Sequence, residues 1–422
     1  MHSLTGLSTW DGARRRDLVH GIAAAMEGRR AEIVATAGEE TGLAPARLEG
    51  EFDRTTGQLR LLGDFVASGR DRPTVTSPSA APGGADVVLV RVPIGPVAVF
   101  AASNFPLAFG VLGADTAAAL AAGCPVVVKA HPAQPRTAEL LAACAPAELL
   151  TLRHGGPDVS LEIVRDPLVR AVAFTGSPSG GRALMDAAAA RPEPIPVYAE
   201  MGSLNPVFVL PSALPDPSWP SALAASVTGS SGQLCTKPGL VFVPDSPAGR
   251  AFAERLGAEV AAAGPVGRLL TPSIEAAHAE WSRRAASCGT KSGSSVFALF
   301  IEASSLGGAL LEEHFGPAVV VCAAPASSFG ALAAALPGSL TATVLAAPDD
   351  PALDALLPPL MATAGRVVLN GVPTGVAVCD AMHHGGPWPA TSNALHTSVG
   401  TGSVSRFLRP VALQGLPPRL LP

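Results

Sequence analysis

The first part of the chain repeats apolar residues at helical spacing. Leu18, Ile22 and Met26 lie four residues apart, and similar runs follow them. We therefore expect residues 11–70 to form helices, the third of them over residues 55–66. Polar and charged positions fill the spaces between the apolar ones, which is typical of helices that bury one face.

The pattern changes to turn-forming residues after this helical stretch. Residues 71–86 (DRPTVTSPSAAPGGAD) are rich in Pro, Gly, Ser and Thr, which indicates a loop or the tip of a hairpin. Residues 87–91 (VVLVR) then predict a short strand that leads out of it. The tail, residues 407–422, is interrupted by prolines and is expected to form an extended arm.

Short apolar runs then alternate with helical segments, which predicts a parallel, doubly wound α/β sheet. A second alternation begins near residue 217. The strands expected in the first series are 97–100, 125–129, 149–153, 171–174, 197–200 and 207–210, and its helices are 116–122, 136–145 and 180–190. The second series has helices 221–230 and 248–263 and strands 239–243, 318–322 and 366–370.

The composition indicates a well-packed protein of more than one domain. A chain of 422 residues is too long for one core and suggests two or three domains. Apolar residues make up 48% and charged residues 15%, unlike a disordered chain, and the net charge of −5 argues against nucleic-acid binding. Only three of the 29 Lys and Arg residues are lysines, so each lysine is of interest.

One uncharged stretch, residues 92–114, has the length of a membrane span. A helix in lipid would be broken or destabilised by Pro93, Pro96, Asn104 and Pro106, so two buried elements joined by a turn are expected instead.

The six cysteines show neither CxxC spacing nor a zinc-finger pattern, and the N-terminus has no apolar signal-peptide region. We expect a cytoplasmic protein with reduced thiols and no metal site.

Cys235 is a candidate nucleophile. It lies in SSGQLCTKPG, after an expected helix and before an expected strand, where Gly232 and Gly239 permit tight backbone turns. Backbone N–H groups and Lys237 could favour its thiolate there. The alternative is a small residue of the core, which is the commoner role of a single cysteine.

Glu200 is a candidate general base. It ends an apolar strand and precedes Gly202, at the edge where α/β sheets bind ligands. A carboxylate in such a position is costly unless it has a partner or a function, and it could activate water. The alternative is an ordinary glutamate in a surface turn.

Two further motifs suggest ligand binding, although each is weak alone. FTGSPSGG, residues 174–181, follows a strand and opens a helix, so a phosphate could approach the helix N–H groups. The Asn104 amide, between a strand and Pro106, could hold a developing oxyanion. The alternatives are a common glycine-rich turn and an Asx-turn.

The order of these motifs resembles the aldehyde dehydrogenase superfamily over roughly residues 12–410. The motifs are ASNFPLAF, CPVVVKAHP, FTGSPSGG, AEMGSLNP, GQLCTKPG and EEHFGP. More narrowly, RTTGQLR, GQLCTKPGLVFVP, NGVPTGVAVCDAMHHGGPWPAT and SVGTGSVSRFLRP resemble the branch that oxidises 2-oxoglutarate semialdehyde. The resemblance implies an NAD(P)-dependent enzyme that oxidises a small oxo-acid semialdehyde to a carboxylate through a cysteine thiohemiacetal and thioester.

The resemblance also implies roles for individual residues. Cys235 would be the nucleophile, Glu200 the general base and Asn104 the oxyanion amide. The residues implied for the cofactor are Lys129, Gly176, Ser177, Gly180, Glu313 and Phe315. Those implied for the substrate are Arg60, as the cation for a carboxylate, with Phe105, Thr391 and Ser392; an arginine on the helix surface is the alternative for Arg60.

NADP is expected in preference to NAD, which stays possible. Relatives that prefer NAD place a glutamate shortly after the lysine that binds the adenosine ribose, whereas here KAHPAQPR has no acid before Glu139. A 2′-phosphate would therefore meet no carboxylate from this segment, and His131 or Arg136 could assist it.

The implied fold is α/β, with a Rossmann-type cofactor domain (1–73 and 94–202), an α/β catalytic domain (203–400) and a β oligomerisation arm (74–93 and 401–422). The arm implies a homodimer or homotetramer. The chain is short for the family near residues 145–150 and 282–312.

Two other functions stay open: a non-redox acyl transferase that uses the cysteine thioester, and a non-catalytic scaffold with a damaged cofactor pocket.

Overall fold

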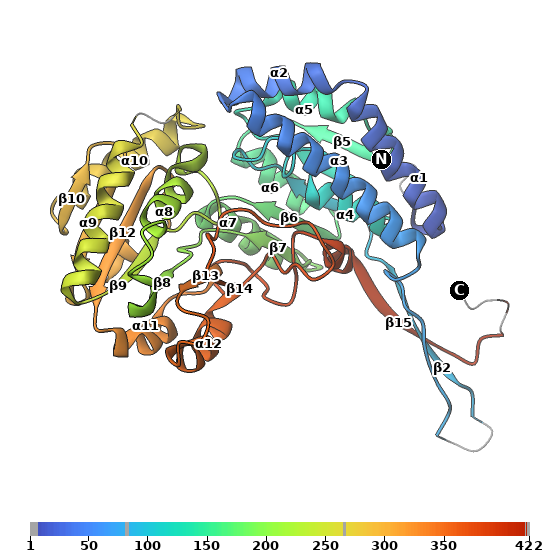
Figure 1. The fold of residues 1–422 in the computed structure, drawn as a ribbon. Coiled ribbons are helices and arrows are strands. Elements are labelled where there is room, and N and C mark those ends of the chain that lie inside the picture. Colours follow the sequence, from blue (N-terminus) through green and yellow to red (C-terminus); the bar gives the residue numbers. More distant parts are fainter. Residues whose placement is uncertain (1–6, 81–83, 265–266, 418, 420–422) are drawn as a thin grey trace.

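The structure is a computed structural model that describes residues 7–80, 84–264, 267–417 and 419. Two α/β bodies lie side by side, and a thin β arm extends away from both of them (Figure 1). The expected start of the first domain at residues 1–6, part of the expected loop at 81–83, and the ends of the arm at 418 and 420–422 lie outside the described residues.

Three α-helices follow a short 3-10 helix (Leu7–Thr9) and cover the first body (Figure 1). They are α1 (Gly12–Glu27), α2 (Arg30–Thr41) and α3 (Pro45–Ala67). Helix α3 begins about ten residues before the predicted start, because Pro45 at its first position suits a helix N-terminus. Its buried side includes Leu48, Phe52 and Leu59, which pack into the core of the first body.

The first sheet has five parallel strands in the order β5-β4-β3-β6-β7. Alternate residues of its strands face two apolar cores, one under α1 to α5 and one under α6 and α7, which is the doubly wound arrangement that the sequence predicted. The strands are β3 (Val97–Phe100), β4 (Val126–Lys129), β5 (Leu150–Arg153), β6 (Ala171–Thr175) and β7 (Val197–Glu200). The helices are α4 (Ala114–Ala122), α5 (Pro135–Ala142), α6 (Pro157–Arg165) and α7 (Pro178–Ala189).

The second sheet has seven strands in the order β10-β11-β12-β9-β8-β13-β14, parallel except for the edge strand β10. Helices again cover both faces. The strands are β8 (Val207–Val209), β9 (Leu240–Pro244), β10 (Thr290–Gly293), β11 (Phe297–Glu302), β12 (Ala318–Ala324), β13 (Ser339–Leu345) and β14 (Ala364–Leu369). The helices are α8 (Trp219–Thr228), α9 (Pro247–Ala262), α10 (Pro272–Ala285), α11 (Phe329–Ala335) and α12 (Ala352–Thr363).

The arm is a three-stranded antiparallel sheet of order β1-β2-β15. Its strands are β1 (Val75–Ser77), β2 (Val87–Pro93) and β15 (Leu408–Gln414), so it joins two segments more than 300 residues apart in the chain. Figure 1 shows β2 and β15 running away from both bodies. The arm strands fall within the two ranges expected for the arm, 74–93 and 401–422.

The uncharged stretch 92–114 forms the end of β2, strand β3, a loop and the first residue of α4. Most of this stretch is buried among apolar residues of the first body. No described helix is both long enough and apolar enough to cross a membrane.

Candidate active site

A single large cavity gathers most of the predicted site residues from both bodies. Its volume is about 1140 Å³, and its lining includes Asn104, Glu200 and Cys235. It also includes every residue that was predicted for the cofactor, namely Lys129, Gly176, Ser177, Gly180, Glu313 and Phe315. Neither of the two shortened segments, 145–150 and 282–312, contributes to this lining.

Cys235 lies in a turn that the surrounding chain holds firmly. Ser230, Ser231 and Gly232 before it have positive φ angles of 51°, 58° and 68°. Gly232 is required because a Cβ there would come within 2.2 Å of the Gly316 carbonyl oxygen. The Asn205 side-chain amide then donates hydrogen bonds to the carbonyl oxygen of Cys235, at 2.8 Å, and to that of Lys237, at 2.9 Å.

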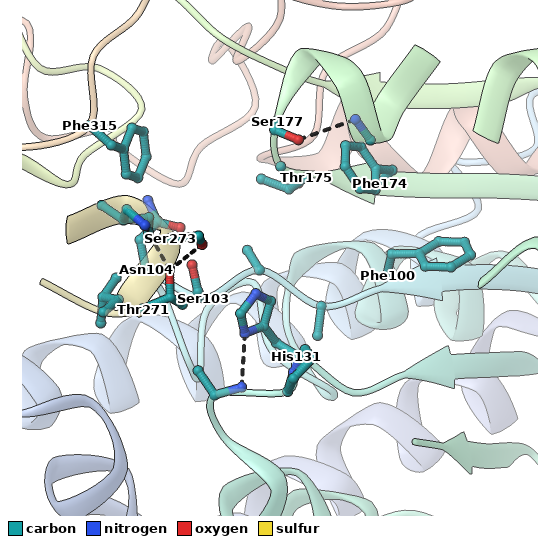
Figure 2. A pocket seen from close by; sticks show the side chains of 18 of the residues that line it. Phe100, Ser103, Asn104, His131, Phe174, Thr175, Ser177, Thr271, Ser273 and Phe315 are labelled. Carbon is teal, nitrogen blue, oxygen red and sulfur yellow. Dashed lines mark hydrogen bonds between the residues drawn. The ribbon is translucent and has the colours of Figure 1, made fainter. Parts of the chain in front are cut away.

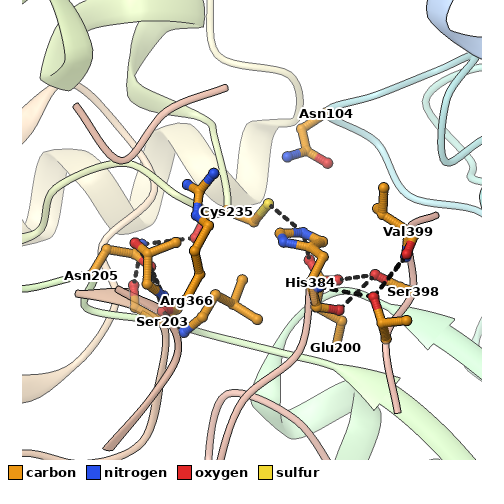
Figure 3. Close-up of polar contacts among 12 residues, drawn as sticks. Asn104, Glu200, Ser203, Asn205, Cys235, Arg366, His384, Ser398 and Val399 are labelled. Atoms are coloured by element: carbon orange, nitrogen blue, oxygen red, sulfur yellow. Dashed lines mark hydrogen bonds and ion pairs between the residues drawn. The ribbon is translucent and has the colours of Figure 1, made fainter. Parts of the chain in front are cut away.

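The Cys235 thiol contacts a histidine, which in turn contacts Glu200 (Figure 3). The distance from Cys235 Sγ to His384 Nε2 is 3.7 Å, and Nε2 lies 3.2 Å from Glu200 Oε1. The other carboxylate oxygen of Glu200 accepts a hydrogen bond of 2.8 Å from Ser398 Oγ. The His384 and Glu200 side chains are 3% and 4% exposed, so this polar chain lies in a region of low dielectric constant, where charge interactions are strong.

The local charges have opposite effects on the two acidic groups. Burial raises the pKa of Glu200, but His384, Ser398 and Cys235 more than offset this effect and lower the pKa below its ordinary value. Burial, followed by the nearby Glu200 and Glu313, raises the pKa of Cys235 well above its ordinary value. The resting site therefore holds a carboxylate and a protonated thiol, and the thiol needs a proton acceptor before it can attack.

The three groups could also ligate a metal ion. One ligand atom from each of Glu200, Cys235 and His384 lies within 4.8 Å of the others, and thiolate, imidazole and carboxylate are the ligands that zinc prefers. The same atoms form the chain of contacts between the thiol and the carboxylate. The arrangement can thus transfer a proton, and it could bind zinc.

Asn104 reaches the site from a loop that α3 fixes. Its Nδ2 donates to the Gln233 carbonyl oxygen at 3.0 Å, which leaves the second amide hydrogen for a ligand. The buried Glu51 Oε1 accepts hydrogen bonds from the N–H groups of Leu107, at 2.8 Å, and Ala108, at 2.9 Å. The Arg47 guanidinium forms an ion pair with the Glu51 carboxylate at 3.1 Å and donates a hydrogen bond to the Asn104 carbonyl oxygen at 2.7 Å. Arg47 thus links Glu51 to the backbone of Asn104.

The opposite part of the cavity has the features of a dinucleotide site. Helix α7 begins there, and its cap residue Ser177 accepts a hydrogen bond from the Gly180 N–H at 3.1 Å (Figure 2). A Cβ at Gly176 would lie 2.6 Å from the Phe174 ring, so only glycine lets the backbone come this close. A helix N-terminus approached over glycines suits a phosphate group, so these residues fit a dinucleotide.

The residues at the adenosine end differ in part from the expectation. Lys129 lines the cavity, but burial lowers the pKa of His131 to about 4, so His131 carries no charge at neutral pH. Arg136 forms ion pairs with Glu39 and Glu40 instead of standing free. Glu40 brings an acid to this cavity from α2, although its carboxylate already accepts hydrogen bonds from the N–H groups of Arg136 and Thr137.

The structure does not bring Arg60 to the cavity. Arg60 lies on the outer side of α3, where it pairs with Glu27 at 2.7 Å and its side chain stays 38% exposed. Arg54, at the start of the same RTTGQLR motif, faces the site instead. Burial lowers the pKa of Arg54, and the charges of Cys235, Glu51 and Glu200 partly oppose this effect. Its guanidinium lies 6.0 Å from the centre of the Phe105 ring. The two arginines are six residues apart, which places them on different faces of a helix.

The other predicted substrate residues lie beside the site without lining the large cavity. Phe105 packs edge-on against Phe109, with ring centres 5.9 Å apart. Ser392 accepts a hydrogen bond from the Ala199 N–H at 2.8 Å, and the backbone of Thr391 pairs with that of Glu200. Thr391 and Ser392 thus hold strand β7, which carries Glu200.

His384 is the functional residue that the sequence reasoning missed. It lies in the quoted motif MHHGGPWPAT, but two adjacent histidines in a glycine-rich loop give no indication of which one contacts a cysteine 149 residues earlier. A Cβ at Gly385 would lie 2.8 Å from the His383 ring and 2.5 Å from the His396 carbonyl oxygen, so the neighbouring glycine belongs to the close packing of this loop.

Comparison with known proteins identifies the family. The family model described as the aldehyde dehydrogenase family matches residues 2–298. The alpha-ketoglutaric semialdehyde dehydrogenase 2 of Azospirillum brasilense is 44% identical over 92% of this chain and 80% of its own length. The alpha-ketoglutaric semialdehyde dehydrogenase of Acinetobacter baylyi is 40% identical over 97% of this chain and 84% of its own length.

Solved structures share the fold at lower identity. Lactaldehyde dehydrogenase from Escherichia coli superimposes with a TM-score of 0.84 at 22% identity, over 97% of this chain and 87% of that one. Proline utilization A of Bradyrhizobium japonicum also gives 0.84, at 23% identity, but the match spans only 43% of that longer chain. The predicted fold class and the resemblance drawn from the motifs are confirmed: the chain belongs to the aldehyde dehydrogenase family.

Proposed function

We propose that this aldehyde dehydrogenase oxidises a small oxo-acid semialdehyde to the corresponding dicarboxylate, with NADP as the preferred cofactor. The observation that carries the proposal is the Cys235, His384 and Glu200 chain beside the Asn104 amide, at the edge of a cavity suited to a dinucleotide. Two relatives at 44% and 40% identity, both named for alpha-ketoglutaric semialdehyde, support this class of substrate.

In the first half-reaction, Cys235 Sγ attacks the aldehyde carbon. His384 Nε2, 3.7 Å from the thiol sulfur, accepts the thiol proton. Oxygen develops negative charge as the carbonyl becomes tetrahedral, and the free N–H of the Asn104 amide stabilises it. The product of this step is a thiohemiacetal on Cys235.

When bound, a nicotinamide would supply the hydride acceptor for oxidation of this adduct to a thioester, and Glu313 and Phe315 in the cavity lining would hold it. In the second half-reaction, the Glu200 carboxylate takes a proton from a water molecule, which attacks the thioester carbon. The carbon–sulfur bond breaks, the acid leaves, and Cys235 regains its proton. Glu200 suits this role because its lowered pKa keeps it ionised at neutral pH. This carboxylate favours hydrolysis over acyl transfer to an amine or thiol.

NADP is favoured by the charges at the adenosine end of the cavity. Lys129 is a cation in the lining, and the nearby acid Glu40 already accepts hydrogen bonds from α5. A 2′-phosphate would therefore meet the Lys129 cation, on which the charge of Asp158 also acts. Comparing kcat/KM for NADP and NAD tests this preference, and Lys129→Gln should reduce the NADP value more than the NAD value.

The enzymatic proposal is tested by mixing the purified chain with 5-oxopentanoate and NADP and following absorbance of the reduced nicotinamide. Turnover that disappears in Cys235→Ala, while NADP binding survives, would support it. Turnover that persists in Cys235→Ala would contradict it.

We further propose that the β1-β2-β15 arm joins subunits into a dimer or tetramer, because it projects beyond both bodies. A monomer in light scattering at micromolar concentration would contradict that assembly.

A further inference from the structure

We propose that Arg54 is the residue that binds the distal carboxylate of the substrate, and that it thereby selects aldehydes with an anionic tail. This inference deepens the proposed function and rests on the reacting aldehyde end lying at Cys235. The geometry points to Arg54 through the face of α3 on which it lies, the contacts of its neighbours and the lack of a protein acceptor for its guanidinium.

One face of α3 is directed at the catalytic loop. Arg47, Glu51, Arg54 and Gln58 follow one another at spacings of four, three and four residues, so they form one stripe along the helix. Arg47 and Glu51 are engaged with each other and with the backbone of residues 104–108. The next turn of the same stripe presents Arg54.

Arg54 lies in a half-buried position with an aromatic contact but no hydrogen-bonded anion, although the charge of Glu51 also acts on it. Its guanidinium carbon lies 6.0 Å from the centre of the Phe105 ring, next in sequence to Asn104. Within the described part of the chain, Arg54 has no hydrogen bond or ion pair. A half-buried guanidinium without an acceptor is costly, and a bidentate carboxylate is the partner that best matches its donors.

The adjacent turn offers a second polar group. Gln58 is only 5% exposed, and its side-chain amide makes no hydrogen bond within the described residues. Because Gln58 is one helical turn beyond Arg54 on the same face, the two side chains together present donors for a carboxylate and an acceptor for a neighbouring polar group.

The charges around the nucleophile explain why an anionic substrate needs such a cation. Glu200 is ionised at neutral pH and acts on the Cys235 thiol, so a carboxylate that enters this region meets negative charge. The positive charge of Arg54 has the opposite effect on this thiol, because it lowers the pKa of Cys235. Binding the substrate tail at Arg54 would therefore offset the repulsion while the aldehyde end remains free to reach Cys235.

A second arginine near the thiol is already occupied. Figure 3 shows Arg366, from β14, beside Cys235. Its two terminal nitrogens donate to the backbone carbonyl oxygens of Gly375 and Pro373. Its donors thus hold the loop after β14, whereas those of Arg54 are available to a ligand.

The test compares aldehydes of equal length with and without the anion. We expect the wild-type enzyme to prefer 5-oxopentanoate over pentanal, and Arg54→Gln to lower kcat/KM for 5-oxopentanoate roughly 10- to 100-fold, the loss typical of one charged hydrogen-bonded pair. The value for pentanal should change little. Arg54→Lys keeps the charge but loses the bidentate geometry, so its kcat/KM for 5-oxopentanoate should fall between those of the wild type and Arg54→Gln. This ratio does not depend on the fraction of folded enzyme.

Arg60→Gln is the matched comparison, because Arg60 lies on the same helix but pairs with Glu27. It should leave the ratio of the two aldehydes unchanged. The inference is wrong if Arg60→Gln lowers the ratio of kcat/KM for 5-oxopentanoate to that for pentanal. It is also wrong if Arg54→Gln lowers kcat/KM equally for both aldehydes. An equal loss would mean that Arg54 acts on the thiol or on the oxyanion instead of on the substrate tail.

A measurement without turnover separates this inference from the proposed function. Glutarate should slow alkylation of Cys235 by iodoacetamide in the wild-type chain, and Arg54→Gln should require at least about ten times more glutarate for the same protection. Glutarate protection that is identical in both proteins would overturn the inference even if aldehyde oxidation is active. Protection that depends on Arg54 in a chain that oxidises no aldehyde would instead sustain this inference and contradict the proposed function.

Discussion

Glu200→Gln should affect the two half-reactions in opposite directions. The amide has nearly the same shape as the carboxylate but carries no charge and accepts no proton. In the native site the Glu200 charge opposes ionisation of the Cys235 thiol, and the relevant ligand atoms lie within 4.8 Å of one another. Removing that charge should therefore lower the pKa of Cys235 and increase the thiolate fraction.

The size of the effect follows from the distance. The ligand atoms lie within 4.8 Å of one another, and two unit charges at that limiting separation interact by about 3 kcal/mol at the effective dielectric constant of buried protein sites. This energy corresponds to roughly a 100-fold larger thiolate fraction. A thiolate of lower pKa is also less nucleophilic, which cancels about half of this gain on a logarithmic scale. Alkylation of Cys235 by iodoacetamide at neutral pH should thus become roughly 10-fold faster.

Hydrolysis should fail in the same variant. Loss of a general base lowers turnover by roughly 10²- to 10⁴-fold, so the thioester should accumulate after one turnover. We expect a stoichiometric burst of reduced cofactor and an added acyl mass on Cys235 in the intact-protein mass spectrum. Glu302→Gln, which changes a surface carboxylate paired with Arg250, is the control and should behave like the wild type.

Two results would refute this reasoning. If Glu200→Gln shows slower alkylation and no burst, Glu200 acts before the thiol attacks and is the effective base for Cys235. If it turns over at the wild-type rate, Glu200 only completes the end of β7, where its backbone pairs with that of Thr391.

Three other perturbations test separate parts of the site. His384→Asn should slow iodoacetamide alkylation of Cys235 and reduce the burst rate roughly 10²-fold or more, because the proton acceptor 3.7 Å from the thiol is lost; an unchanged alkylation rate would contradict the relay. Glu51→Gln should lower kcat roughly 10-fold with little change in the NADP dissociation constant, because it loosens the loop that carries Asn104. A loss of NADP affinity as large as the loss of kcat would instead indicate general misfolding. Zinc ions should inhibit the enzyme reversibly and protect Cys235 from alkylation until EDTA is added, and protection that persists in His384→Asn would argue against the three-ligand geometry.

Much of the fold could be read from local pattern. The strands of the first sheet were predicted within one or two residues, because short β-branched runs between helices are typical of a parallel sheet. Elements without that pattern were missed. Strand β13 alternates Thr with apolar residues, and both Thr341 and Thr343 are fully buried; helix α12 contains Pro358 and Pro359. In both cases tertiary packing outweighed local propensity.

The sequence alone determined the family and the tight turn that carries Cys235, because motifs such as GQLCTKPG carry residue types and glycine positions that a short segment can specify. Only the tertiary structure decided which distant groups meet. His384 reaches Cys235 across 149 residues, and Glu40 lines the large cavity from α2. Within RTTGQLR, the helical repeat turns Arg54 toward the site and Arg60 away from it. A linear pattern names candidate side chains, but their partners depend on how separate elements pack.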